Sequence, residues 1–134
     1  MTTDAATRGT TSKGMRWAGW IVSAIPALMM GAGGIFMAVG HPDAVSEGMV
    51  KYGYPATVAR PLLIVEVACV VLYLIPQTAV LGAILLTGYL GGAVATHVRA
   101  SEAWFFPVIF GVLVWLGVYL RDARVRALVP LRRL

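Results

Sequence analysis

Charged side chains are scarce in this sequence, and their scarcity excludes most soluble folds. Only 13% of the 134 residues are Asp, Glu, Lys or Arg, whereas 59% are hydrophobic. A typical soluble domain carries about 25% charged residues. The mean hydropathy of +0.80 agrees with this contrast. The composition therefore predicts one integral membrane domain, with no room for a separate soluble module.

Cysteine occurs once and asparagine does not occur at all. Because Cys69 lies inside an apolar run, the chain can form neither an intrachain disulfide nor a CxxC redox pair, which excludes thiol–disulfide chemistry by this chain alone. The lack of asparagine excludes N-glycosylation. The two histidines, His41 and His97, are far apart and have no third ligand at a recognisable spacing, so no metal site is predicted.

Long apolar runs are what the sequence has instead. The first, residues 17–39, contains twenty-three residues without a charge. As a helix it would be about 34 Å long, which is enough to cross a hydrocarbon core of ~30 Å. The predicted fold is an all-α integral membrane four-helix bundle, with spans at residues 17–39, 58–75, 78–96 and 103–120. We expect one membrane domain at 15–126, between a disordered tail at 1–14 and a basic tail at 127–134.

Lysine and arginine are unevenly distributed between the two ends of such a bundle. Lys51, Arg60 and Arg99 lie on the side of the loops 40–57 and 97–102. If both termini share the other side, that side carries eight basic residues: Arg8, Lys13, Arg16, Arg121, Arg124, Arg126, Arg132 and Arg133. The positive-inside rule then predicts cytoplasmic termini. We interpret the net charge of +5 as a topology signal, so no nucleic-acid partner is expected.

One carboxylate interrupts the second run near its middle. An acid at the depth of Glu66 costs a few kcal/mol, so it must be neutral, paired or turned toward a polar cavity. We predict a polar pocket that opens outward, with Glu66 at its base and His97 and Arg99 at its rim. The predicted ligand-binding residues are Glu66, Tyr73, Tyr89, His97, Arg99 and Trp104, with Tyr52, Tyr54 and Trp115 as further lining.

Two alternatives remain open for these residues. Glu66 and His97 are candidate catalytic residues. In the alternative interpretation, Glu66 has no catalytic role and only fixes the register of the helices. Since Glu66 lies mid-span and His97 lies at the end of the next span, Tyr89 and Thr87 are geometrically easier partners for the carboxylate. His97 is a candidate proton carrier, a quinone or haem contact, or a solvated loop histidine. Gly88 and Gly92 match a helix-packing pattern.

Several motifs together resemble a known family. They are Glu66 in the second span, YLIPQTAVLGAILLTGYLGGA (73–93), THVR (96–99) and WLGVYLRD (115–122). Over residues 53–126 the chain resembles the DoxX-like family of small four-helix bacterial membrane proteins. Relatives include the DoxD-type subunit of thiosulfate:quinone oxidoreductase and partners in oxidative-stress complexes. The resemblance implies the bacterial inner membrane and redox-associated or quinone-linked work, although the chain has no cofactor motif of its own.

Four functions follow from these features. The first is a DoxX-like subunit that binds a lipophilic or quinone-like molecule in the outward pocket, with Glu66 as polar anchor or proton acceptor. The second is a cofactor-free membrane enzyme that uses Glu66 and His97 as an acid–base pair for isomerisation or epoxide opening. The others are a small proton-coupled exporter and a structural partner. Expected partners are the bilayer, a lipophilic molecule, and either further copies of the chain or other subunits.

Overall fold

The computed structural model describes residues 10–130, and within this range all regular secondary structure is helical. Three helices are long and apolar enough to cross a membrane, and a shorter apolar helix follows them. The elements are α1 (Lys13–Pro26), the π-helix η1 (Ala27–Ala32), α2 (Gly33–Gly40), α3 (Pro42–Lys51), the 3₁₀-helix η2 (Ala56–Val58), α4 (Ala59–Leu74), α5 (Ala79–Arg99), α6 (Phe105–Arg121) and α7 (Ala123–Leu128). The chain is therefore an all-α, multi-pass membrane protein, and helices occupy all four predicted runs.

The first long helix runs from Lys13 to Gly40 but changes form in its middle. Pro26 has no backbone N–H to donate to the carbonyl four residues earlier, and the next six residues form a π-helix. The predicted N-terminal tail lies largely outside the described residues, as does the end of the basic tail. Within the range described, α1 already begins at Lys13 and α7 takes up the chain to Leu128.

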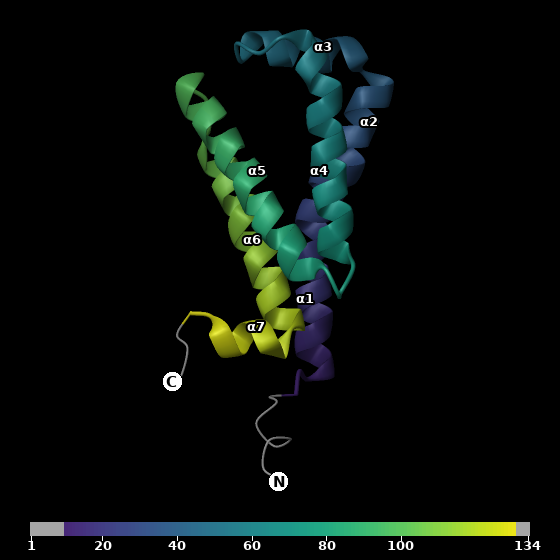
Figure 1. Ribbon diagram of the computed structural model, residues 1–134, viewed down its shortest axis with the longest axis vertical. Coiled ribbons are helices and arrows are strands. Elements are labelled where there is room, and N and C mark those ends of the chain that lie inside the picture. Colours follow the sequence, from purple (N-terminus) through teal and green to yellow (C-terminus); the bar gives the residue numbers. More distant parts are fainter. Residues whose placement is uncertain (1–9, 131–134) are drawn as a thin grey trace.

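The long helices form two arms that diverge from a common base (Figure 1). One arm contains α4 packed against η1 and α2, and the other contains α5 packed against α6. The arms meet at the base, where α1 packs on α6 and a short turn at residues 75–78 joins α4 to α5. The helix α3 lies across the far end, which we call the outer end (Figure 1). The start of α1 and α7 share the base (Figure 1).

The core lies at the base and is centred on Tyr73, whose side chain is fully buried. Its hydroxyl bonds at 2.9 Å to Ser23 Oγ of α1 and at 2.9 Å to the Val114 carbonyl of α6. Gly82 allows α5 to approach α4 here, because an added Cβ would lie 2.5 Å from the Cα of Tyr73. One tyrosine thus connects α1, α4 and α6 at the point where the arms join.

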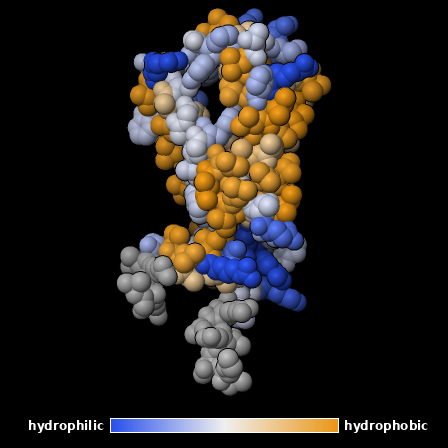
Figure 2. All heavy atoms as spheres, in the orientation of Figure 1, coloured by the Kyte–Doolittle hydropathy of each residue, from blue (hydrophilic) through white to orange (hydrophobic). Residues whose placement is uncertain are grey.

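Hydrophobic residues cover the middle of the molecule, and hydrophilic residues gather at its two ends (Figure 2). Large side chains in this band are well exposed, among them Ile21 at 63%, Phe36 at 66% and Val112 at 60%. Apolar surface of this extent is far more than a soluble monomer exposes. The band is the surface that lipid tails would cover.

Candidate functional site

Glu66 points toward the neighbouring helices and not toward lipid. Tyr89 of α5 donates a hydrogen bond of 3.1 Å from its hydroxyl to Glu66 Oε2. On the other side, a Cβ added at Gly34 of α2 would lie 3.5 Å from the same oxygen. The carboxylate therefore lies between α2 and α5, and the absence of a side chain at Gly34 leaves room for it. Of the two partners considered easiest from the sequence, Tyr89 is the one that bonds to Glu66.

A cavity of about 410 Å³ adjoins this pair and separates α4 from α5 toward the outer end. Tyr89 belongs to its wall, so the hydrogen bond to Glu66 connects the carboxylate to the cavity. The volume lies within the usual 300–1,000 Å³ of small-molecule sites. The other lining residues are Met49, Tyr52, Tyr54, Val58, Leu62, Gly88, Gly92, Ala93, Thr96 and His97.

Two glycines of α5 create this space. A Cβ added at Gly88 or Gly92 would have no heavy atom within 4 Å, apart from the helix's own backbone and chain neighbours. Neither glycine therefore packs against another helix of this chain within residues 10–130, and both border the cavity. By contrast, Gly31 does serve close packing, since its Cβ would lie 3.2 Å from Cγ1 of Val70 on α4.

His97 lines the cavity at its outer end. Its Nδ1 lies 2.7 Å from the carbonyl oxygen of Ala93. Because a carbonyl only accepts, Nδ1 carries the proton, and Nε2 is left for another partner. The imidazole also lies against the ring of Tyr52, with 5.6 Å between the ring centroids. His97 thus lines the cavity itself, whereas Glu66 is joined to the cavity wall through its bond with Tyr89.

Polar contacts join the two arms at the outer end. The residues that form them are called the outer latch: Lys51, Tyr52, Tyr54, Thr96, Arg99 and Glu102. Glu102 forms an ion pair with Lys51 and accepts a hydrogen bond of 2.7 Å from the hydroxyl of Tyr52. Arg99 donates to the carbonyl of Tyr52 over 2.9 Å. Thr96 donates to the Gly92 carbonyl, so the 2.8 Å contact between Thr96 and Tyr54 has the tyrosine hydroxyl as donor.

The charges of the outer latch reinforce one another. Hydrogen bonds from Lys51 and Tyr52 hold the pKa of the Glu102 carboxyl below its ordinary value. The same bonds raise the pKa of the Lys51 ammonium and that of the Tyr52 hydroxyl. Arg99, predicted at the rim, does not line the cavity. It bonds to Tyr52 and stacks over the ring of Tyr54, at 5.5 Å from the ring centroid, instead of reaching Glu66.

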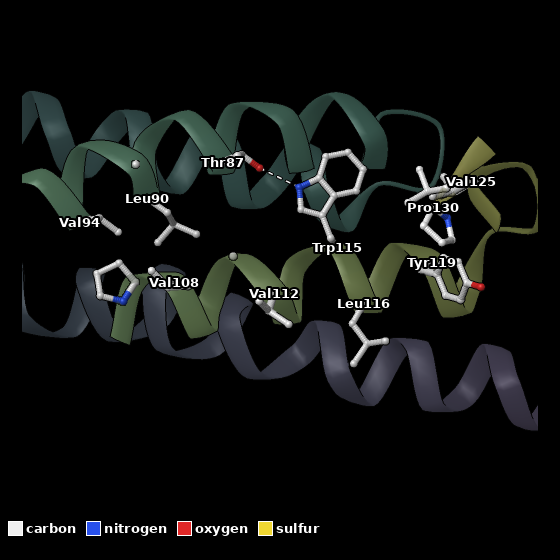
Figure 3. A pocket seen from close by; sticks show the side chains of 14 residues that line it. Thr87, Leu90, Val94, Val108, Val112, Trp115, Leu116, Tyr119, Val125 and Pro130 are labelled. Atoms are coloured by element: carbon white, nitrogen blue, oxygen red, sulfur yellow. Dashed lines mark hydrogen bonds between the residues drawn. The ribbon is translucent and has the colours of Figure 1, made fainter. Parts of the chain in front are cut away.

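Of the six predicted ligand-binding residues, Tyr89 and His97 line the cavity, and the other four, Glu66, Tyr73, Arg99 and Trp104, do not. Tyr73 is fully buried in the base, where it holds α1 and α6. Trp104 precedes α6 and is half exposed. Trp115, predicted as further lining, instead donates its indole N–H to Thr87 across the opposite face of α5 and α6 (Figure 3). There it borders a separate apolar groove of about 630 Å³.

Neither Glu102 nor the cavity-forming role of Gly88 and Gly92 was predicted from the sequence. The sequence did contain a signal for Glu102. Glu102 and Lys51 carry opposite charges and lie in the two loops, 97–102 and 40–57, that were predicted to share the outer side. No signal separates a packing glycine from a cavity glycine before the partner helix is placed. Within residues 10–130, no three side chains of His, Cys, Asp or Glu gather as metal ligands would.

The family model described as the DoxX-like family matches residues 21–117, from the middle of α1 to the second half of α6. Neither a curated protein nor a solved structure matches the chain.

Proposed function

This chain belongs to the DoxX-like family, and from that premise we propose that it binds a lipophilic molecule with a hydrogen-bonding head group in the cavity between α4 and α5. The observation that carries the proposal is the bond from Tyr89 to Glu66 at the wall of that cavity. An acid inside a membrane helix is costly, and the acids that occur there usually mark functional sites. Here it is turned inward and connected to a space large enough for a ligand.

The lining suits a molecule with one polar end. Met49, Val58 and Leu62 offer apolar contact, while Tyr52 and His97 offer hydrogen-bonding groups at the outer end. A quinone fits this description, since it combines carbonyl acceptors with an apolar body. When bound, a quinone supplies electron-accepting chemistry. The unprotonated Nε2 of His97 would accept a hydrogen bond from a hydroxyl of the reduced form, and Glu66 would hold a proton delivered through the hydroxyl of Tyr89.

The cofactor-free enzyme receives less support. It needs Glu66 and His97 to act on one substrate, but the carboxylate is bonded to Tyr89 and the imidazole to the Ala93 carbonyl. In the proton-coupled alternative, the carboxylate would have to reach both ends of the protein. At the base it would meet the tightly packed core around Tyr73. We therefore favour a binding subunit of a redox-associated complex.

The proposed setting is the inner membrane of a bacterium, with residues 15–126 as one membrane domain. Lys13, Arg16, Arg121, Arg124 and Arg126 belong to the described base and its adjoining helix, whereas Lys51, Arg60 and Arg99 belong to the outer half. The positive-inside rule supports cytoplasmic termini and an outer latch on the opposite side. Other subunits, or further copies of the chain, would cover part of the apolar band.

Filling the cavity tests the proposal. Gly92→Leu places a side chain in the cavity, and Gly91→Leu places the same side chain in the groove on the other face of α5. We expect purified protein in lipid nanodiscs to bind decylubiquinone, measured by quenching of tryptophan fluorescence. Gly92→Leu should weaken binding at least tenfold because the leucine occupies the ligand volume, and Gly91→Leu should change it little.

A second variant checks the polar anchor. Glu66→Gln keeps the shape of the side chain but removes its charge and its capacity to take up a proton, and it should also weaken binding. Equal binding by the wild type, Gly92→Leu and Glu66→Gln would remove the cavity as the ligand site. If neither the wild type nor either variant bound decylubiquinone saturably, quinones would be excluded as the ligand class.

A further inference from the structure

Arg121 has an unusual environment at the base, far from the proposed cavity. Its guanidinium lies between two aromatic rings, 4.4 Å from the centroid of Trp20 and 4.6 Å from that of Tyr73. Nη2 donates a hydrogen bond of 2.7 Å to the carbonyl of Tyr73, near the C-terminal end of α4. This bond satisfies a carbonyl that α4 itself leaves free. One nitrogen of the three thus has a structural task.

The other two nitrogens have no such task. Nε and Nη1 of Arg121 are buried, and neither has a hydrogen-bond partner among the described residues. The ion pair of Lys51 and Glu102 is the single salt bridge in residues 10–130, so no carboxylate lies within 4 Å of the Arg121 guanidinium, and Asp122 acts on it only from a longer distance. The faces of two aromatic rings stabilise a cation only in part. A partly buried charge in this state favours an anion beside it.

A pocket of about 390 Å³ lies beside this guanidinium. Arg16 and Trp20 of α1 contribute to its wall, together with Pro76, Ala79, Val118 and Asp122. Asp122 is the acid of this pocket, and its carboxylate already accepts the backbone N–H of Arg124 over 2.8 Å. Two arginines against one engaged aspartate leave the pocket with a net positive charge. Its volume is many times the roughly 30 Å³ share of one water.

We propose that this pocket binds the phosphate group of an anionic phospholipid. The pocket is lined by residues from the start of α1, the turn after α4 and the end of α6, all at the base. Toward the base the hydrophobic band gives way to hydrophilic residues, as lipid tails give way to head groups (Figure 2). Exposed apolar side chains of the same helix, Trp17 and Ile21, would contact the acyl chains of the lipid. Basic pockets between membrane helices are typical sites for anionic head groups. The site does not depend on the proposed quinone-like ligand.

The test compares two lipids of equal chain length on the full chain in detergent. Native mass spectrometry would measure the apparent affinities for dioctanoyl-phosphatidylglycerol and dioctanoyl-phosphatidylcholine. Arg16→Gln removes a pocket charge, and its side chain makes no hydrogen bond to the described residues, so the fold should persist. Lys13→Gln is the matched control, because it removes the same charge one turn earlier on α1 without touching the pocket.

The wild type should prefer phosphatidylglycerol. Arg16→Gln should lower the affinity for phosphatidylglycerol about fivefold, which is the effect of one cation near an anionic head group. Lys13→Gln should lower the same affinity less than twofold. Equal affinity for the two lipids, or equal losses in the two variants, would overturn the proposal. Inorganic phosphate is the third ligand tested. Displacement of the lipid by phosphate at equal concentration would assign the pocket to a free anion and overturn the lipid head group.

Discussion

At the scale of single residues, two tyrosines that look alike in the sequence have different tasks. Tyr89 lines the cavity and donates to the carboxylate of Glu66. Tyr73 is fully buried in the base and bonds to Ser23 and Val114. The hydroxyl of Tyr89 belongs to the site, and the hydroxyl of Tyr73 belongs to the packing of the helices.

Removing each hydroxyl should separate these tasks. Tyr73→Phe leaves buried polar groups without their partner and should lower the free energy of unfolding by about 1–3 kcal/mol. Its affinity for decylubiquinone should remain unchanged. Tyr89→Phe should weaken that affinity and change stability less. Denaturant unfolding and fluorescence quenching on the same preparations provide both readouts, and a reversed pattern would place the ligand at the base.

Sequence reasoning located these residues only in part. Tyr73 follows Glu66 by seven residues, so the helical repeat correctly puts both on one side of α4. Seven residues also correspond to about 10 Å along the helix axis, and that depth separates the cavity from the base. The apolar runs could be predicted because composition and length determine membrane helices. The offset between neighbouring helices, which decides depth, depends on packing that one sequence does not display.

At the scale of helices, glycines in α5 act in opposite ways according to what faces them. Gly82 faces the backbone of Tyr73 so closely that α4 and α5 touch. Gly88, two turns later, faces open space at the cavity. The same residue type therefore brings the helices together at the base and leaves room for a ligand toward the outer end.

Alanine substitutions should reveal this difference as opposite signs. Gly82→Ala forces α4 and α5 apart and should destabilise the protein by about 1–3 kcal/mol or more. Gly88→Ala meets nothing and improves helix propensity, so it should be neutral or stabilise by up to about 1 kcal/mol. Denaturant unfolding in one detergent compares the two directly. Equal losses would show that both glycines pack against a neighbouring helix.

At the scale of the whole molecule, the outer latch connects the arms where the helices diverge. Its centre is Glu102, bonded to Lys51 and Tyr52 of the opposite arm. Because the pKa of Glu102 is lowered in the fold, its contribution is present above the ordinary carboxyl pKa of 4.5 and is lost as pH falls through the lowered value. The pKa of Lys51 is raised, so its charge persists across the neutral range. The ion pair at the centre of the latch is therefore present at neutral pH and lost in acid, and we expect the arms to move apart there.

Distance measurements between the arms should detect this opening. Spin labels on cysteines introduced at Val50 and Ser101, with Cys69 replaced by Ala, report on the outer end. The distance distribution should broaden below pH 4.5 in the wild type, and Glu102→Gln should broaden it already at neutral pH. Glu47→Gln is the matched control, since Glu47 is exposed and makes no side-chain hydrogen bond to the described residues. A distribution that stays narrow in Glu102→Gln would show that other contacts hold the arms.

The tight base and the polar outer end have a practical consequence for handling the protein. The base holds its helices through buried packing, so a purified sample can retain its helical content and its melting temperature while the ion pair and the hydrogen bonds at the other end have separated. Circular dichroism would register such a sample as intact. Tests of ligand competence therefore require buffers of low ionic strength near neutrality, together with a probe positioned beyond the core.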